Sequence, residues 1–395
     1  MKFSEKVYNC LPWLPAYVWQ GWTGRRILPA SGHLIVCLAD HFEPAIVPGQ
    51  GERRAAHDVQ EQRLERWCQE IPEAVKEWRD AEGFPLRHTY FYPAEQYDRG
   101  LVEKLAEHCN DGWGEIEVHL HHGTESPDTV ENTRRTLLNF RDILASHGCL
   151  SQWHGQGEPR YAFVHGNFAL ANSANNRNCG VDAEMSILSE TGCFGDFTLP
   201  SAPNPSQVAK INALYECGLP LGERAPHRRG RDLRRGCAPE IFPLIVQGPL
   251  LWDFSRWKHG LPYPTIENSE LTALHPPTLA RLQLWRRAAI AVRGRPDWLF
   301  VKLHCHGMDP RDEEVMFGET MRRFLRELVE SAKQGGEFKV HFTTAREMVN
   351  ILLAACEGKT GNPGDYRNDH FLRIRGSRVR EMVQQNSSPG SLSRS

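Results

Sequence analysis

Residues 115–123 read Glu-Ile-Glu-Val-His-Leu-His-His-Gly, and this stretch decides the fold we expect. In a β-strand successive side chains point to opposite faces, so one face of this segment is apolar and the other carries acids and histidines. The apolar face holds Ile116, Val118 and Leu120, and the polar face holds Glu117, His119 and His121. Gly123 and the turn-forming residues after it end the strand and lead into a helix. The histidines therefore stand at the carboxyl end of the strand, where parallel α/β folds place their chemistry.

The composition is that of a large soluble domain with almost no net charge. The chain has 395 residues, 40% of them hydrophobic, which is enough to bury one large core. Its 47 Lys and Arg nearly balance 49 Asp and Glu, so nothing in the total charge favours nucleic acid or an anionic membrane. We therefore expect no nucleic-acid partner.

Cysteine usage and the N-terminal sequence predict a cytoplasmic protein. The eleven cysteines are scattered and contain no Cys-x-x-Cys pair, a pattern typical of reduced thiols. Pro12, Pro15 and Gln20 interrupt the apolar residues that a signal peptide would need. Since no window of about 18 apolar residues exists, we expect no transmembrane span.

Apolar strand-like segments alternate with segments of helical periodicity over most of the chain. The expected strands are 33–39, 87–92, 115–121, 161–165, 194–199, 242–247, 297–304 and 338–342. The expected helices are 57–80, 98–109, 128–147, 181–191, 205–217, 276–293, 311–332 and 343–357. This alternation predicts a (β/α) barrel of seven or eight strands, possibly distorted.

The barrel is expected to occupy residues 32–357. Residues 1–31 form an N-terminal arm rich in Tyr and Trp, which we expect to pack over the main domain, with an interfacial membrane contact as the alternative. Residues 358–395 are dominated by Gly, Asn, Pro, Ser and Arg and predict a disordered tail.

Polar residues follow strand after strand, and in a barrel these strand ends converge on one rim. They are Asp40, His41 and Glu43; Glu95; His119, His121 and His122; His165 and Asn167; Asp196; and His304 and His306. Two of these strand ends carry a His-x-His pair, whose imidazoles face the same way. Neutral imidazoles beside a carboxylate suit a divalent metal, zinc above all, whereas hydrogen-bonded structural histidines would leave the same pattern.

Short motifs in this order resemble those of the polysaccharide deacetylases, the NodB-like carbohydrate esterases. The segment 115–119 is similar to the family strand E-I-G-x-H, and Asp40 resembles the aspartate that closes the family's first strand. Leu303 and His304 resemble the last motif, in which a leucine lines the acetyl pocket and a histidine acts as acid. The resemblance spans residues 33–306 and implies a metal-dependent hydrolase that removes an acyl group from an amino sugar or glycan.

The resemblance implies roles for particular residues and also marks departures. It implies that Asp40 and His119 hold the metal, with His121 or His122 as the second histidine, because Gly123 stands where the family has its own. The family's aspartate pair is here Asp40-His41, so Asp40 or, second, Glu43 would take the proton of the metal-bound water. His304 or His306 would protonate the leaving amine.

The substrate contacts and the reaction class stay open in the sequence. Candidate substrate-binding residues are Glu95, Asn167, Asp196 and Leu303. The arginine-rich loop 224–236 is either a solvated loop or a site for an anionic ligand. Two alternatives remain: a metal-independent glycoside hydrolase that pairs Asp40 with Glu95, Glu117 or Asp196, and a non-catalytic glycan-binding protein. The sequence fixes neither the sugar, the scissile bond nor the oligomeric state.

Overall fold

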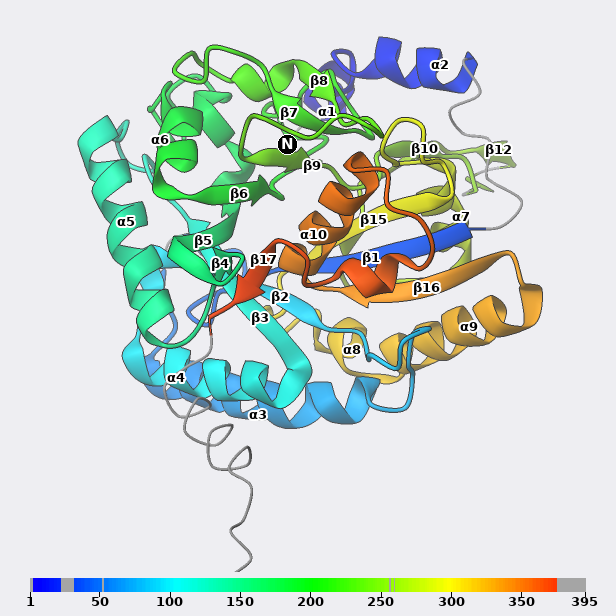
Figure 1. Ribbon diagram of the computed structural model, residues 1–395, viewed down its shortest axis with the longest axis horizontal. Coiled ribbons are helices and arrows are strands. Elements are labelled where there is room, and N and C mark those ends of the chain that lie inside the picture. Colours follow the sequence, from blue (N-terminus) through cyan, green and yellow to red (C-terminus); the bar gives the residue numbers. More distant parts are fainter. Residues whose placement is uncertain (1–2, 23–31, 52, 256, 259, 375–395) are drawn as a thin grey trace, which may run out of the picture.

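A curled, mostly parallel β-sheet of 13 strands organises the chain (Figure 1). The computed structural model describes residues 3–22, 32–51, 53–255, 257, 258 and 260–374. Along the sheet the strands follow the order β14 (Glu270–Leu271), β15 (Trp298–Cys305), β1 (Gly32–His41), β2 (His88–Pro93), β3 (Gly114–Leu120), β5 (Gln156–His165), β6 (Cys193–Asp196), β9 (Leu244–Val246), β7 (Leu214–Cys217) and β8 (Gly230–Asp232). The remaining strands of this sheet are β16 (Phe338–Thr343) beside β1, and β4 (Ser151–Trp153) and β17 (Phe371–Arg373) beside β5.

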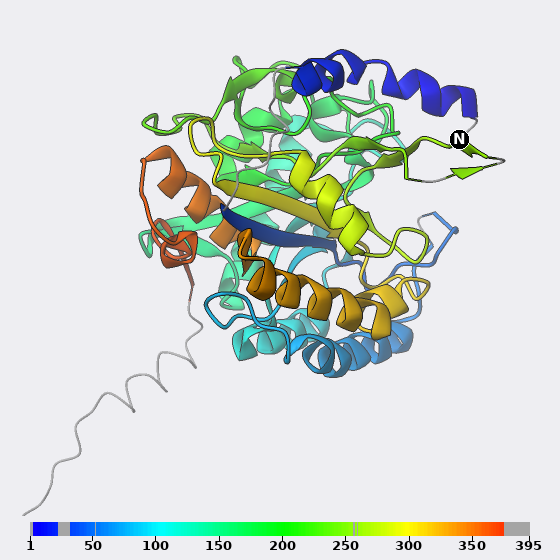
Figure 2. The same cartoon turned by 90° about the vertical axis from the view of Figure 1, so that its right-hand side faces the viewer.

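Helices surround the sheet, and two small two-stranded sheets lie outside it. The helices are α1 (Phe3–Cys10), α2 (Leu14–Trp22), α3 (His57–Val75), α4 (Arg99–His108), α5 (Val130–Ser146), α6 (Glu184–Thr191), α7 (Leu279–Arg287), α8 (Glu313–Met316), α9 (Glu319–Gly335) and α10 (Ala345–Cys356). The small sheets pair β10 (Leu251–Asp253) with β13 (Thr265–Glu267), and β11 (Trp257–Lys258) with β12 (Leu261–Pro262). Figures 1 and 2 show α3, α4 and α9 on one side of the molecule and α1 and α2 on the opposite side.

The prediction of a closed barrel of seven or eight strands is wrong. The sheet has 13 strands and stays open, a half-barrel with one edge at β14 and the other at the antiparallel strands β7 and β8. The last strand, β16, does not close the ring; it shares one edge of β1 with β2, pairing with Gly32 to Cys37 while β2 pairs with Leu38 to His41.

Helix α10 explains why the sheet cannot close on itself. All of its residues are buried, and it packs on the concave face against β1, β5, β6 and β16. A helix is about 10–12 Å wide with its side chains, so it takes the space that opposite strands of a small barrel would fill. The polar side chains of this buried helix, Arg346, Glu347 and Asn350, are satisfied by internal partners.

The eight expected strands each coincide with a strand, and one expected helix is wrong. Residues 205–217 form turns followed by β7. Asn212 adopts a left-handed backbone, and the side chain of Gln247 donates to the carbonyl of Lys210. These two features replace helical hydrogen bonds, since a non-glycine residue in that conformation interrupts a right-handed helix.

The two faces of the sheet build two separate hydrophobic clusters. On β3, Ile116, Val118 and Leu120 belong to the larger cluster, which also takes residues of α3, α4, α5, α6 and α9. Glu115, Glu117 and His119 alternate with them and point to the concave face. On β1, Ile35, Cys37 and Ala39 belong to the cluster around α10. Each strand therefore delivers every second side chain to the concave side.

The C-terminal part of the chain is ordered further than the sequence predicts, since residues 358–374 contain β17. Trp13, between α1 and α2, is fully buried and stacks on Trp252, and Gln20 donates to the carbonyl of Ile211. Residues 358–374, expected in the disordered tail, include β17 because buried Phe371 packs on Phe194 at a ring distance of 4.4 Å. Residues 23–31 of the expected arm and 375–395 of the expected tail lie outside the described residues.

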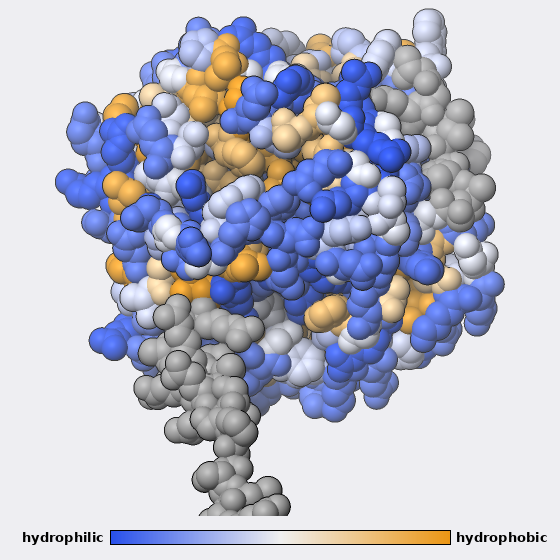
Figure 3. Space-filling view, viewed as in Figure 1, coloured by the Kyte–Doolittle hydropathy of each residue, from blue (hydrophilic) through white to orange (hydrophobic). Residues whose placement is uncertain are grey.

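Polar side chains dominate one face of the molecule (Figure 3), although single large hydrophobic residues such as Leu274 are exposed. No helix within the described ranges is long and apolar enough to cross a membrane. The face seen in Figure 1 is mostly hydrophilic, with hydrophobic side chains in smaller areas between polar ones (Figure 3). All eleven cysteines are free thiols.

Removing the Arg346 guanidinium should destabilise the fold strongly. Arg346 lies at the start of α10 and donates to both oxygens of buried Glu115, at 2.6 and 3.0 Å, and to the carbonyl of Phe371. In Arg346→Met the buried carboxylate loses its partner, so we expect the free energy of unfolding to fall by about 3–5 kcal/mol in urea titrations. Arg99→Met, which breaks an exposed pair with Glu103, should cost less than about 1 kcal/mol. A loss for Arg346→Met as small as that of Arg99→Met would contradict this role.

Acidification should destabilise the protein through buried His108. Burial, helped by the charge of His88, lowers the pKa of His108 to about 4, and its Nε2 lies 3.1 Å from the hydroxyl of Tyr90. Between about pH 6.5 and pH 4 the unfolded chain binds this proton and the folded chain does not, so stability falls as the pH falls. His108→Gln should reduce the stability lost between about pH 7 and pH 4 by on the order of 3 kcal/mol. Exposed His154→Gln is the control, and equal losses in the two variants would contradict the assignment.

Candidate functional site

An open pocket of about 670 Å³ lies at the carboxyl ends of β1, β2, β3, β5 and β15. Each of these strands, or the turn that follows it, contributes polar side chains to the wall. The polar lining includes His41, Glu43, Arg53, Arg54, Glu95, Gln96, His121, Thr124, Asn167, Asn178, His306 and Arg311. The parallel strands all run the same way, which brings His41, Glu43, Glu95, His121, Asn167 and His306 of the expected strand-end residues to one pocket.

Three metal-donor side chains converge at the pocket: His41 and Glu43 line it, and fully buried His119 lies beside them. Donor atoms of His41, Glu43 and His119 all lie within 4.8 Å of one another. The Nδ1 of His119 donates to the carbonyl of Val164 at 2.8 Å. The Nε2 atom of the neutral ring therefore carries a free lone pair. The Nε2 atoms of His41 and His119 are buried and have no hydrogen-bond partner among the described residues. Such orphaned buried nitrogens call for an explanation, and a cation supplies one.

The electrostatics of these three side chains favour cation binding. Burial lowers the pKa of His41 well below its usual value, and His306 and His119 add to this effect. Burial and then His121 lower the pKa of His119 as well, so both imidazoles are neutral and able to bind a metal. Burial alone would raise the pKa of Glu43, but the histidines around it bring this pKa to about 2. The group is therefore two neutral imidazoles and one carboxylate.

His121 and Glu95 form a pair beside the three donors. The Nδ1 of His121 lies 2.7 Å from a carboxylate oxygen of Glu95, and its Nε2 lies 3.7 Å from the nearer oxygen of Glu43. Burial lowers the pKa of His121, but Glu95 and Glu43 outweigh it and the pKa is raised overall. An imidazole oriented by a carboxylate is suited to proton transfer in the pocket.

The imidazoles of β3 and β15 meet around His41. The ring of His41 lies 5.2 Å from His119, 5.9 Å from His304 and 4.8 Å from His306, measured between ring centroids. Phe168, in the turn after β5, lies 6.0 Å from His41 and covers the same group. His306 lines the pocket, whereas His304 is buried behind it.

Asp40, expected as metal ligand and base, lies on the opposite face of β1. It is fully buried, its Oδ2 lies 2.9 Å from the Nδ1 of His88, and its Oδ1 accepts a hydrogen bond from the backbone of Gly307. A side chain added at Gly307 would clash with Asp40, so the contact is close. Because alternate residues of a strand face opposite sides, His41 takes the position in the pocket and Asp40 holds the turn that carries His306.

The other expected site residues divide between the pocket and the core. Glu95 and Asn167 line the pocket. Asp196 is fully buried on β6 and accepts hydrogen bonds from Thr198, and burial raises its pKa to about 7. Leu303 belongs to the cluster on the helix-covered face. His122 points away from the pocket toward α6, where its Nε2 lies 3.0 Å from Glu184.

The arginine-rich loop lies apart from this pocket, and three of its six arginines form ion pairs. Arg224 binds Asp182, Arg229 binds Glu223 and Arg231 binds Glu216. Arg231 and Arg234 line a second hollow with Lys210 and Asp232. The guanidinium groups at the candidate site come instead from Arg53, Arg54 and Arg311.

Sequence reasoning missed His41 as a donor and Phe168 as a cover. Both faces of β1 are apolar, so the sequence gave no sign of which of Asp40 and His41 faces the concave side. Phe168 adopts a left-handed backbone, which the sequence does not signal. A second donor group of His122, His165, Cys179 and Glu184 was also missed because its members are far apart in the chain.

The fold and the site define a mostly parallel α/β protein with buried histidine, cysteine and carboxylate clusters that could hold a metal ion. Comparisons with known protein families and with curated proteins found no match. The functional argument therefore depends on the geometry of the site.

Replacing Glu95 should lower the pKa of His121. Glu95→Gln removes the negative charge that stabilises the imidazolium, so we expect the pKa of His121 to fall from above its ordinary value of about 6.5 to that value or below it. NMR titration of histidine-labelled, metal-free protein measures this shift, with the signal assigned by loss in His121→Gln. Glu107→Gln, on an exposed position of α4, should leave the titration unchanged. An unaltered pKa in Glu95→Gln would contradict the pairing.

Proposed function

We propose that this chain is a metal-dependent hydrolase of the polysaccharide deacetylase type, which removes an acyl group from an amino sugar or glycan. The observation that carries the proposal is the convergence of His41 and Glu43, which line an open pocket, with buried His119. Sites that hold a catalytic metal use three protein ligands and leave a position for water or substrate. Of the motifs that resemble the deacetylases, the strand 115–119 supports the same activity through His119, whereas Asp40 and Leu303 lie outside the pocket.

The donor set suits zinc. His41 and His119 would bind through Nε2 and Glu43 through a carboxylate oxygen, and two imidazoles with one carboxylate are a known ligand set of catalytic zinc. When bound, the metal supplies a Lewis acid for the acyl oxygen and lowers the pKa of its water toward about 7.

Proton transfer falls to His121 in this proposal. Glu95 fixes the imidazole through Nδ1 and leaves Nε2 free to exchange a proton inside the pocket. Because Glu95 and Glu43 raise its pKa overall, His121 holds a proton more readily than a free imidazole does and can donate it to the departing amine. His306, beside His41 on the other wall, is the second candidate donor. Asp40 has no part in this step because it lies behind the strand.

The wall of the pocket is suited to a polar substrate. Asn167 and Asn178 offer amide groups for sugar hydroxyls, and Arg53, Arg54 and Arg311 offer positive charge toward the mouth. Phe168 provides an apolar surface next to His41, where a small acyl group would lie.

A glycoside hydrolase is less well supported. Such an enzyme needs one carboxyl group with a raised pKa to act as acid. The pKa values of both pocket carboxylates, Glu43 and Glu95, are lowered by the histidines beside them. Glu117 and Asp196 do have raised pKa values, but both are buried in the core.

Loss of the pocket metal should abolish hydrolysis. We expect His119→Ala to lose one zinc equivalent per chain and to cut kcat/KM for acetylated amino-sugar oligomers by about 100-fold or more. Chelator should do the same to the wild type, and added zinc should restore it. Metal analysis and acetate release measure both effects, with exposed His154→Ala as the matched control.

Three results would contradict the proposal. Acetate release that survives complete removal of metal would exclude the metal-assisted mechanism. Cleavage of glycosidic bonds without acetate release would favour the glycoside hydrolase. Binding of oligosaccharide without turnover, unchanged in His119→Ala, would favour a glycan-binding protein.

A further inference from the structure

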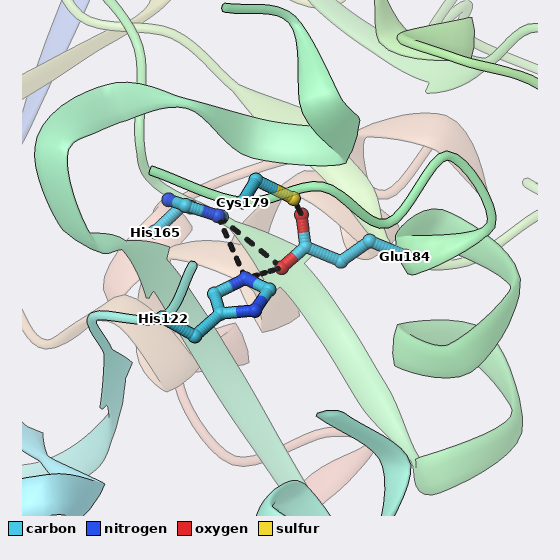
Figure 4. A group of neighbouring side chains, drawn as sticks. All are labelled: His122, His165, Cys179 and Glu184. Atoms are coloured by element: carbon cyan, nitrogen blue, oxygen red, sulfur yellow. Dashed lines mark hydrogen bonds and ion pairs between the residues drawn. The ribbon is translucent and has the colours of Figure 1, made fainter. Parts of the chain in front are cut away.

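A second group of metal-donor side chains lies on the helix-covered face of the sheet, separate from the pocket. His122 follows β3, His165 ends β5, Cys179 lies in the loop before α6, and Glu184 is the first residue of α6. Figure 4 shows the four side chains pointing toward one another. Three of them are fully buried and His122 is 8% exposed. We propose that His122, His165, Cys179 and Glu184 form a structural zinc site.

Both histidines are oriented as metal ligands. The Nδ1 of His122 lies 2.9 Å from Asp128, which also accepts a hydrogen bond from Thr133. The Nδ1 of His165 donates to the carbonyl of Gly166, which can only accept. A second partner that fixes Nδ1 and leaves Nε2 for the metal is the usual arrangement around bound zinc.

The Nε2 atoms of His122 and His165 and one carboxylate oxygen of Glu184 face one another. The two Nε2 atoms lie 3.0 Å apart, and an oxygen of Glu184 lies 3.0 Å from one and 3.4 Å from the other. With both Nδ1 atoms donating, neither neutral imidazole has a proton for this gap. Three acceptors at such distances repel one another unless a positive charge, from a metal cation or from a proton on His122, stands between them. Burial lowers the pKa of His122, but Glu184 and Asp128 raise it well above its usual value.

The spacing matches the edges of a zinc tetrahedron. Zinc bonds of about 2.0–2.3 Å to nitrogen, oxygen and sulfur place neighbouring ligands about 3.2–3.6 Å apart. The observed distances of 3.0 Å between the two Nε2 atoms and of 3.0 and 3.4 Å from them to Glu184 need to change by only a few tenths of an ångström. The Sγ of Cys179 lies 3.6 Å from the second oxygen of Glu184, and all four donor groups lie within 4.8 Å.

The backbone is built for this close approach. A side chain at Gly123 would clash with the backbone of Cys179, so glycine lets the His122 loop reach the cysteine. The amide of Ala171 donates to the outer oxygen of Glu184, which directs the other oxygen to the histidines. Four protein donors in a buried place leave no position for substrate, which is the mark of a structural rather than a catalytic zinc.

The site would fix the wall of the catalytic pocket. The loop between His165 and Glu184 carries Asn167, Phe168 and Asn178, which line the pocket. Phe168 and Ala171 in this loop have left-handed backbones, at φ of 59° and 47°. Residues other than glycine hold such conformations only where the surrounding structure enforces them. A metal that joins both ends of the loop would enforce them.

Cobalt substitution tests the site, because Cys179 is one of its four donors. Cys305→Ser is the control for the other cysteine-containing donor group among the described residues, formed by Asp40, His88 and Cys305. Protein stripped of metal and loaded with Co²⁺ should show the near-ultraviolet band of thiolate-to-cobalt charge transfer. We expect Cys179→Ser to lose this band and one metal equivalent, and Cys193→Ser, another buried thiol, to keep both. His119→Ala should also keep the band, so failure of the proposed pocket metal and failure of this site are distinguishable.

A wild-type protein that folds and binds Co²⁺ without the thiolate band would overturn the proposal, as would a band that persists in Cys179→Ser. The first result would mean that a proton shared by His122 and Glu184 holds the group together. If Cys179→Ser does not fold, X-ray absorption of zinc-loaded His119→Ala decides. One sulfur at about 2.3 Å from zinc supports the site, and a shell of nitrogen and oxygen alone overturns it.

Discussion

The strict alternation of side chains across β1 and β3 is the constraint on which both sites depend. On β3, His119 therefore faces the concave side and Leu120 faces the helices. Beyond the strand, His121 lines the pocket and His122 points toward α6. On β1 the same alternation gives His41 to the pocket and Asp40 to the core. A shift of one residue in β1 would exchange Asp40 and His41 between the two faces, and a shift in β3 would put an aliphatic side chain in place of His119.

The concave face has room for this chemistry because α10 fills only part of it. The helix packs against β1, β5 and β6, while the pocket opens at the carboxyl ends of the strands. Arg346 anchors the helix to Glu115 of β3 and to the backbone around Phe371, so β17 and the preceding segment close this side of the molecule. An open half-barrel with an internal helix thus keeps the parallel strand ends of a barrel without needing a closed ring.

Much of the sheet could be predicted from the sequence, because strands covered on both sides are short apolar runs between turn signals. The failure of the sheet to close could not be predicted, because Arg346, Glu347 and Asn350 give residues 343–357 the composition of a partly exposed helix, whereas the whole helix α10 is buried. The histidine pair of β3 was predictable from its period of two, with His119 and His121 in one pocket. Asp40 was misplaced because apolar residues flank it on both faces of β1. His165, Cys179 and Glu184 escaped notice because only the folded loop brings them to His122.

The central claim is that His41, Glu43 and His119 hold a cation in the pocket. Anomalous diffraction at the zinc absorption edge, from crystals of protein purified without a histidine tag and supplied with zinc, tests it most directly. The account predicts an anomalous peak enclosed by the two Nε2 atoms and the Glu43 carboxylate, and its loss in crystals of His119→Ala. A pocket free of anomalous density, with the histidine nitrogens bonded only to water or to protein groups, would contradict it.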